Sequence, residues 1–225
     1  MIATAMEEQL WRWAERFSNH FSADEYSELL EVKSALQSPL SAARRQQALV
    51  FSMYQLLING AIAEHNIHVY GSNFPDFVHL RLNDDILDEA VVSAWKGVAY
   101  IPARSNILGS IAFMVVLLFF FEACCRMQLN DDDSSLKIML DKLKGKGSID
   151  QYAYGALTYL AELRNVWHNF GLHKPTKKEC SYHSANAALI FPRLIPGQTT
   201  EPLGEGEKMH LVDQVLETFC KLTNV

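Results

Sequence analysis

The chain has 225 residues, and 49% of them are hydrophobic, which is enough apolar side-chain area to bury a sizeable core. Its formal net charge at pH 7 is -6, so no positive field over the whole molecule attracts nucleic acid, and any nucleic-acid site has to be a local basic patch. The four cysteines include no CxxC pair, which predicts reduced thiols in a cytoplasmic protein rather than a disulfide framework.

The first part of the chain is predicted to form three helices, over residues 4–20, 23–36 and 41–64. In the first and the third, apolar side chains recur every three or four residues, as one buried face of a helix requires. Ser41 is a suitable cap for the third helix. Turn-forming residues at positions 70–75 then predict an ordered but irregular connection over residues 66–104, with a short helix near its middle.

A long apolar stretch, residues 107–121, contains no charged side chain. A helix needs about 20 apolar residues to cross a membrane, so this stretch is too short and predicts a helix over residues 106–128 that is buried in a bundle. The polar residues 130–135 should end that helix and cap the next one, residues 136–144.

A sixth helix is predicted over residues 149–170, because an apolar stripe recurs every three or four residues along it and includes Ala156, Leu160 and Leu163. Ser148 is its expected cap, and Gly171 is expected in the left-handed position after its last turn. Residues 187–194 are a short apolar segment that fits either a strand or an extended crossing. A last helix is expected over residues 208–222. The predicted class is therefore mostly α, with one short β segment near residues 187–194.

The side chains with the most chemistry lie at the end of the sixth predicted helix. Residues four apart are neighbours on one face of a helix, and this applies to Arg164 and His168. Asn165 is close enough to touch His168, and His173, after the glycine turn, is placed where it can fold back toward it. An imidazole that moves a proton beside a guanidinium that binds phosphate is the equipment for cleaving a phosphodiester without a metal.

A basic loop with Lys174, Lys177 and Lys178 follows at once and would attract phosphate locally. An ordinary explanation also stands, because Arg, Asn and His before a glycine form a common helix stop signal, and lysines after it are usually solvated. Cys180 and His183 would need two distant partners to hold zinc, so no metal site is predicted.

The segment YLAELRNVWHNFG resembles the signature of HEPN domains, a family of helical bundles named for higher eukaryotes and prokaryotes nucleotide-binding. Arg164, Asn165 and His168 match the signature in type and order. The family's usual gap between its arginine and histidine is about four to six residues, whereas three residues separate Arg164 from His168 and eight separate it from His173. This departure leaves open a variant subgroup or a binding scaffold without nuclease chemistry.

The resemblance implies a HEPN-like bundle over residues 101–225 behind an N-terminal helical extension, residues 1–100. It implies a metal-independent endoribonuclease that leaves a 2′,3′-cyclic phosphate and acts as a toxin or phage-defence effector, usually as a homodimer, with an antitoxin or defence-system protein as partner. No cofactor and no membrane association are expected. The alternative is a non-catalytic helical module that dimerises and binds a partner protein or a nucleotide. The expected catalytic residues are Arg164, Asn165, His168 and His173, with the choice between the two histidines open, and the expected RNA-phosphate contacts are Lys174, Lys177 and Lys178.

Overall fold

The structure, a computed structural model, describes residues 5–34, 41–82, 111, 113–169 and 171–225. These residues form helices joined by irregular segments, which confirms the predicted mostly α class. The chain divides into two compact units, one made of Met1–Leu30 and Phe51–Met114, the other of Glu31–Val50 and Val115–Val225. The predicted division near residue 100 lies outside the described residues, as does the short helix predicted within residues 66–104.

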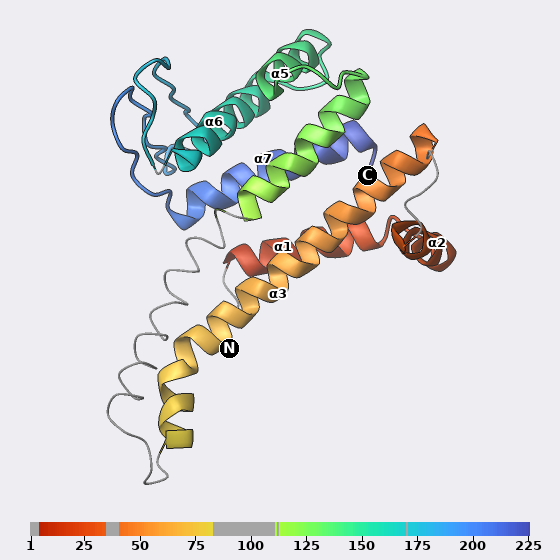
Figure 1. The fold of residues 1–225 in the computed structure, drawn as a ribbon, viewed down its shortest axis with the longest axis vertical. Helices are drawn as coiled ribbons and strands as arrows, with labels where there is room; N and C mark the ends of the chain where they lie inside the picture. Colours follow the sequence, from red (N-terminus) through yellow and green to blue (C-terminus); the bar gives the residue numbers. More distant parts are fainter. Residues whose placement is uncertain (1–4, 35–40, 83–110, 112, 170) are drawn as a thin grey trace. The chain divides into compact units, whose positions relative to one another are not determined.

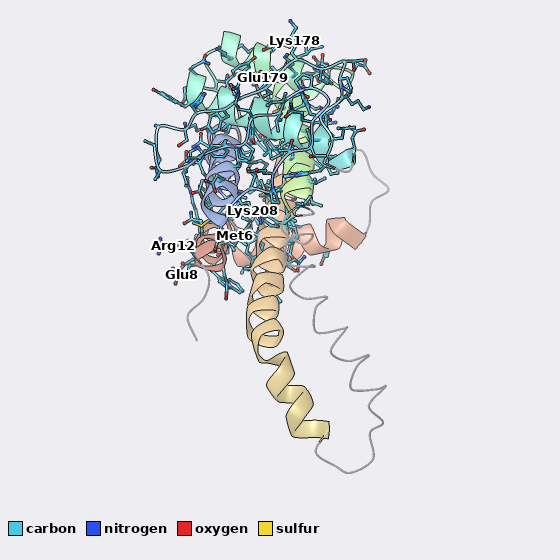
Figure 2. All side chains as sticks on the ribbon, turned by 90° about the vertical axis from the view of Figure 1, so that its left-hand side faces the viewer. Met6, Glu8, Arg12, Lys178, Glu179 and Lys208 are labelled. Atoms are coloured by element: carbon cyan, nitrogen blue, oxygen red, sulfur yellow. The ribbon has the colours of Figure 1, made fainter. Side chains whose placement is uncertain are left out.

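The N-terminal helices are α1 (Ala5–Ser18) and α2 (Ala23–Ser34), close to their predicted bounds (Figure 1). In α1 the side chain of Met6 is buried, whereas those of Glu8 and Arg12 are exposed (Figure 2). A capping box precedes α2, because the Ser22 hydroxyl accepts from the backbone N–H of Glu25 at 3.2 Å and the Glu25 carboxylate accepts from the Ser22 N–H at 2.9 Å.

The third helix, α3 (Ala42–Leu82), is much longer than the sequence predicted. Its start is as predicted, since the backbone N–H of Arg44 donates to the Ser41 hydroxyl at 3.3 Å. The irregular connection predicted from residue 66 is wrong for residues 66–82. The chain remains helical there, through Gly71 and Pro75. A proline ring clashes with the carbonyl four residues earlier, and a glycine at that position lets the backbone bend to relieve the clash. Figure 1 shows α3 turning in its C-terminal part.

Besides Glu31–Val50, the second unit contains four helical segments: residues 115–129, α5 (Leu136–Gly145), α6 (Gln151–His168) and α7 (Glu205–Thr223). Helix α6 packs against both α5 and α7. Apolar side chains from all four segments are almost fully buried, including Leu117, Phe121, Leu140, Leu157, Leu160 and Phe219. None of the described helices is long and apolar enough to cross a membrane.

The break between residues 129 and 136 is confirmed, and a cluster of polar contacts stabilises it. Asn130 has φ 51°, a left-handed conformation that ends the preceding helix. The Asp131 carboxylate accepts from the Ser134 N–H at 3.0 Å and from the Lys142 ammonium. The hydrogen bonds from Lys142 and Ser134 hold the pKa of the Asp131 carboxyl well below its usual range.

Helix α6 begins at a different cap from the predicted one. Asp150, not Ser148, is the N-cap, and its carboxylate accepts from the backbone N–H groups of Tyr152 at 2.9 Å and Ala153 at 2.8 Å. Residue 148 lies two positions too early because Gly147, at φ 72°, closes the turn after α5 and Ser148 donates its N–H to Leu143. A carboxylate also suits the positive end of the helix dipole better than a hydroxyl does.

The long segment between α6 and α7 is irregular but firmly attached. The β segment predicted near residues 187–194 does not form a strand, and Leu194 makes one isolated bridge, to Cys180. Pro192 has no N–H for a ladder, and its carbonyl accepts from the Tyr159 hydroxyl of α6 at 2.8 Å. The Tyr182 hydroxyl lies 2.7 Å from Nε2 of His210 in α7, and burial lowers the pKa of that imidazole.

The two alternative caps of α6 give a direct test of the local fold. We expect Asp150→Ala to lower the free energy of unfolding by about 1 kcal/mol, because two backbone N–H groups lose their acceptor. Ser148→Ala is the matched control and should change it by less than about 0.5 kcal/mol. Urea denaturation of the full chain measures both, and equal losses in the two variants would contradict the assignment.

Candidate functional site

The rotation of α6 decides which side chains reach solvent at its C-terminal end. Ala156, Leu160 and Leu163 are buried, as the predicted apolar stripe requires. Gly171, with φ 87°, turns the chain away, and its N–H donates to the Val166 carbonyl at 3.0 Å, so the predicted left-handed glycine is confirmed. The residues before this turn are thereby held in fixed positions at the edge of the core.

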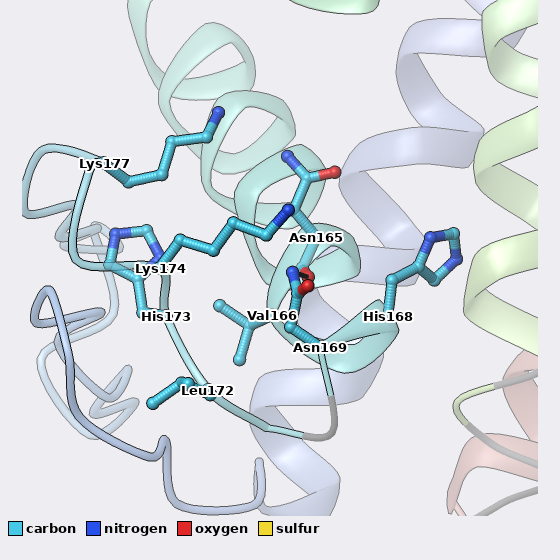
Figure 3. A pocket seen from close by; sticks show the side chains of 8 residues that line it. All are labelled: Asn165, Val166, His168, Asn169, Leu172, His173, Lys174 and Lys177. Carbon is cyan, nitrogen blue, oxygen red and sulfur yellow. Dashed lines mark hydrogen bonds between the residues drawn. The ribbon is translucent and has the colours of Figure 1, made fainter.

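A cavity of about 290 Å³ opens at this end of α6 (Figure 3). Its polar lining combines side chains from the last turns of α6 with side chains of the basic loop. Most of the site residues predicted from the sequence meet here. The lining residues are Asn165, Val166, His168, Asn169, Leu172, His173, Lys174 and Lys177.

Two of the three predicted lysines line the cavity, and the third does not. Lys174 and Lys177 line it, while Lys178 is exposed and lies outside the lining (Figure 2). The Lys177 ammonium lies 3.6 Å from the Glu162 carboxylate, and within the described part of the chain Lys174 pairs with no carboxylate. Two ammonium groups and one carboxylate leave one net positive charge at the cavity.

The end of a helix opposes anion binding, because its free carbonyls carry about half an elementary negative charge. That effect is reduced here. The Asn169 side-chain amide donates to the Asn165 carbonyl at 2.5 Å, and the N–H groups of Asn169 and Gly171 both donate to Val166. The net charge of the two lysines and Glu162 is larger than the dipole charge, so the cavity favours an anion.

His173 is buried, with 2% of its surface exposed, and it holds the basic loop in place. Its Nε2 lies 2.8 Å from the Lys178 carbonyl, and because a carbonyl only accepts, Nε2 carries the hydrogen. Its backbone donates to Gln198 at 3.0 Å and accepts from Gly197 at 2.7 Å. The expectation that His173 folds back toward His168 is wrong, because these bonds turn it into its own loop.

His168 is exposed and, in the described residues, forms no hydrogen bond or ion pair through its ring. It contributes to the rim of the cavity, but its imidazole points away from Lys174, Lys177 and His173 (Figure 3). The helix is continuous from Arg164 to His168, so the two side chains lie one turn apart on one face, as predicted.

Arg164 lies on the face of α6 that meets the helical residues 115–129. Its Nη1 is 3.1 Å from the Glu122 carboxylate, whose other oxygen is 2.7 Å from Nη2 of Arg126. Arg126 also donates to the Asp132 carbonyl. Two guanidinium groups share one carboxylate, so the group keeps one net positive charge.

Three residues of this region were missed by the sequence analysis: Glu122, Arg126 and Asn169. A signal existed for the first two, because Glu122 is the first charged side chain after a long apolar run and Arg126 follows one turn later. The link to Arg164 spans 42 positions along the chain and leaves no local pattern. Asn169 acts through the helix end, where its side chain donates to the Asn165 carbonyl.

A second cavity, of about 730 Å³, lies within residues 182–201 and is less suited to phosphate. The guanidinium of Arg193, on its lining, pairs with Glu179 through Nε at 2.8 Å, and Glu201 adds a negative charge. Its lining includes the buried rings of Tyr182 and Phe191, whose centroids lie 4.8 Å apart.

The cysteines form no reactive or metal-binding centre in the described residues. All four are free, as predicted, and burial raises the pKa of the Cys124 thiol to about 12. Among the described residues no group of three or more His, Cys, Asp and Glu side chains is arranged to hold a metal ion.

Truncation to alanine should lower the free energy of unfolding at one of the two histidines and leave it almost unchanged at the other. His173→Ala is expected to lower the free energy of unfolding by about 1–3 kcal/mol, because it leaves the Lys178 carbonyl without its donor and opens a void. His168→Ala should change it by less than about 0.5 kcal/mol, since the ring is exposed. Urea denaturation measures both, and a larger loss for His168→Ala would refute these positions.

Comparisons of the chain with protein-family models, with curated proteins and with solved structures gave no match. The resemblance to HEPN domains therefore stays a prediction from the residues of α6. The site is defined by its geometry, which consists of a cation-lined cavity at the end of α6, with His168 at its rim and Arg164 paired with Glu122 outside the lining.

Proposed function

We propose that the chain binds the phosphate of a nucleotide or of RNA in the cavity at the end of α6. This corresponds to the non-catalytic alternative predicted from the sequence, with a nucleic-acid ligand. The observation that carries it is the lining, which joins the ammonium groups of Lys174 and Lys177 to the side-chain amides of Asn165 and Asn169. Ammonium and amide N–H groups are donors that phosphate oxygens accept.

The rigidity of the basic loop supports this proposal. His173 and the turn in which Lys177 donates its N–H to the Lys174 carbonyl at 3.0 Å fix the loop before any ligand arrives. A site that is already ordered loses less conformational entropy on binding, so more of the contact energy appears as affinity. The overall negative charge of the chain favours one local contact over the coating of a strand.

A second candidate is metal-independent RNA cleavage, and the exposure of His168 beside Arg164 favours it. In this reaction the 2′-hydroxyl attacks the adjacent phosphorus and loses its proton to a base, the bond to the 5′ oxygen breaks, and an acid protonates that oxygen. His168 is suited to one of the two proton transfers, and Arg164 to stabilising the charge on phosphorus oxygens.

The second proton transfer sets a condition on this candidate. At the α6 end, among the described residues, His168 is the imidazole open to solvent, since His173 is buried and bonded. A homodimer would supply a second His168, and cleavage would fit the toxin or defence role and the antitoxin partner implied by the resemblance.

Binding is tested with a fluorescently labelled RNA octamer. Lys174→Ala and Lys177→Ala should each weaken binding several-fold and reduce the slope of log K against log salt by about 0.7, the effect of one lost phosphate contact. Lys178→Ala is the matched control, with the same charge in the same loop but outside the cavity, and it should leave the slope nearly unchanged. Equal effects of all three would indicate diffuse attraction and sink the proposed cavity site.

Cleavage is tested by incubating the protein with RNA in the presence of a chelator. His168→Ala should lower the rate by at least about 100-fold, as expected for a lost general acid or base, and the products should carry 2′,3′-cyclic phosphates. His183→Ala, which removes an exposed histidine far from α6 in the chain, is the matched control and should retain the rate. Intact RNA with the parent protein would remove cleavage as a candidate while leaving phosphate binding standing.

A further inference from the structure

The second cavity, within residues 182–201, differs in size and in chemistry from the cavity at the end of α6. Its volume is about 730 Å³, against about 290 Å³ at the end of α6, and among the described residues the two have no lining residue in common. Cavities of about 300–1,000 Å³ are typical of sites that bind small organic molecules. The second cavity is therefore large enough for a ligand of its own.

Much of the lining is apolar, and part of this apolar surface is in contact with water. The apolar side chains come mainly from residues 189–195. Ile190 is 79% exposed, whereas its neighbour Phe191 is buried. Removing a large aliphatic side chain from water is favourable, so a ligand that covers Ile190 gains affinity if its own surface is apolar.

The charged side chains of the lining do not favour an anion. Among the described residues the lining contains one basic and one acidic side chain, Arg193 and Glu201, so it carries no net charge while His183 is neutral. Arg193 is also paired with Glu179, through Nε at 2.8 Å. A charged ligand would leave water without gaining an unpaired counter-charge, which is costly, so this lining favours an uncharged ligand.

The walls of the cavity are attached to the neighbouring helices. The Pro192 carbonyl accepts from the Tyr159 hydroxyl of α6 at 2.8 Å, and the Ile190 N–H donates to the Glu207 carboxylate of α7 at 3.1 Å. Walls that are already ordered lose little conformational entropy when a ligand binds. The cavity is therefore formed before any ligand arrives.

One hydroxyl in the wall has no hydrogen-bond partner in the described part of the chain. Thr200 lines the cavity and its N–H donates to the Gly171 carbonyl at 2.9 Å, but its Oγ1 is buried and unbonded. A buried hydroxyl without a partner is unfavourable. Rotation about the Cα–Cβ bond moves this hydroxyl without moving the main chain. It is therefore the donor that we expect a ligand carbonyl to contact.

We propose that the second cavity binds an uncharged small molecule with an apolar body and one carbonyl or amide group. The apolar body covers Ile190 and Phe191, and the carbonyl oxygen accepts a hydrogen bond from the Thr200 hydroxyl. This inference goes beyond phosphate binding and does not rest on it, because the two cavities have different linings and suit ligands of different charge.

Two probes of the same shape test the ligand class. Naphthalene-2-carboxamide is uncharged, and naphthalene-2-carboxylate carries one negative charge on the same ring system. We expect the carboxamide to bind the full chain at least about tenfold more tightly, because burial of the unpaired carboxylate is costly. Isothermal titration measures both dissociation constants. Lys174→Ala, which changes the cavity at the end of α6, should leave carboxamide binding unchanged.

Two neighbouring alanines give a matched pair that locates the site. Ala187 lines the cavity and Ala188 does not, and both are exposed. Ala187→Trp should fill the cavity and weaken carboxamide binding at least about tenfold, whereas Ala188→Trp, which adds the same ring next to it, should match the parent. Ile190→Ser should weaken binding about fivefold, and Ile138→Ser, at an exposed isoleucine of α5, should not.

The hydrogen bond is tested with Thr200→Val, which keeps the size of the side chain and removes its hydroxyl. Carboxamide binding should weaken several-fold. The melting temperature should stay the same or rise, since the hydroxyl has no partner to lose. Thermal melting of all the variants checks that each one folds.

The outcomes separate this inference from the proposed function. Absence of carboxamide binding by the parent, or equal effects of Ala187→Trp and Ala188→Trp, overturns the site. Equal or tighter binding of the carboxylate overturns the uncharged ligand class. These results leave phosphate binding at the end of α6 untouched, because the lysine variants test it separately.

Discussion

The burial of α6 is the constraint on which the candidate site depends. Leu157, Leu160 and Leu163 are almost fully buried between neighbouring helices, so the helix has no freedom to rotate. Burying side chains of this size contributes about 1.5–3 kcal/mol each, far more than any polar contact at the site. The direction of Arg164 and the direction of Asn165 are therefore consequences of core packing.

Charge balance then decides what each side of the helix end can do. Glu162 pairs with Lys177, and Glu122 pairs with both Arg164 and Arg126, so each carboxylate cancels one positive charge beside it. The remaining charge is small and local, which fits a protein whose overall charge is negative. Under the proposed function such a site would select phosphate in a defined position, whereas a broad basic surface would hold any polyanion and lose it readily in salt.

The features that the sequence predicted correctly are those that depend on residues close together in the chain. The apolar stripe of α6, the cap at Ser41 and the glycine at position 171 all depend on residues within one or two turns, and the structure agrees with each. The helical continuation of α3 was missed because Gly71 and Pro75 are typical turn residues that a long helix can still accommodate. Glycine and proline are therefore found both in turns and at bends in long helices, and the local sequence does not distinguish the two.

The site was harder to predict, because its decisive contacts are distant or concern the backbone. Nothing near Arg164 in the sequence points to Glu122, and nothing near His173 shows that its ring bonds to a carbonyl of its own loop. Serine and aspartate both cap helices, and the turn at Gly147 is what places Asp150 rather than Ser148 at the start of α6. The residue types at the site followed from the sequence, whereas the structure was required to show which of them line the cavity and that Arg164 and Lys178 do not.

The bond between His173 and the Lys178 carbonyl has a consequence for how this loop can change. The imidazole contacts the main chain of residue 178, so substitutions that change the size or charge of the side chain at this position keep the bond. Positions 171 and 197, which both require a left-handed backbone, and position 173 have no such freedom. Relatives of this chain would therefore share a glycine, histidine and glycine framework around a loop whose outer residues vary.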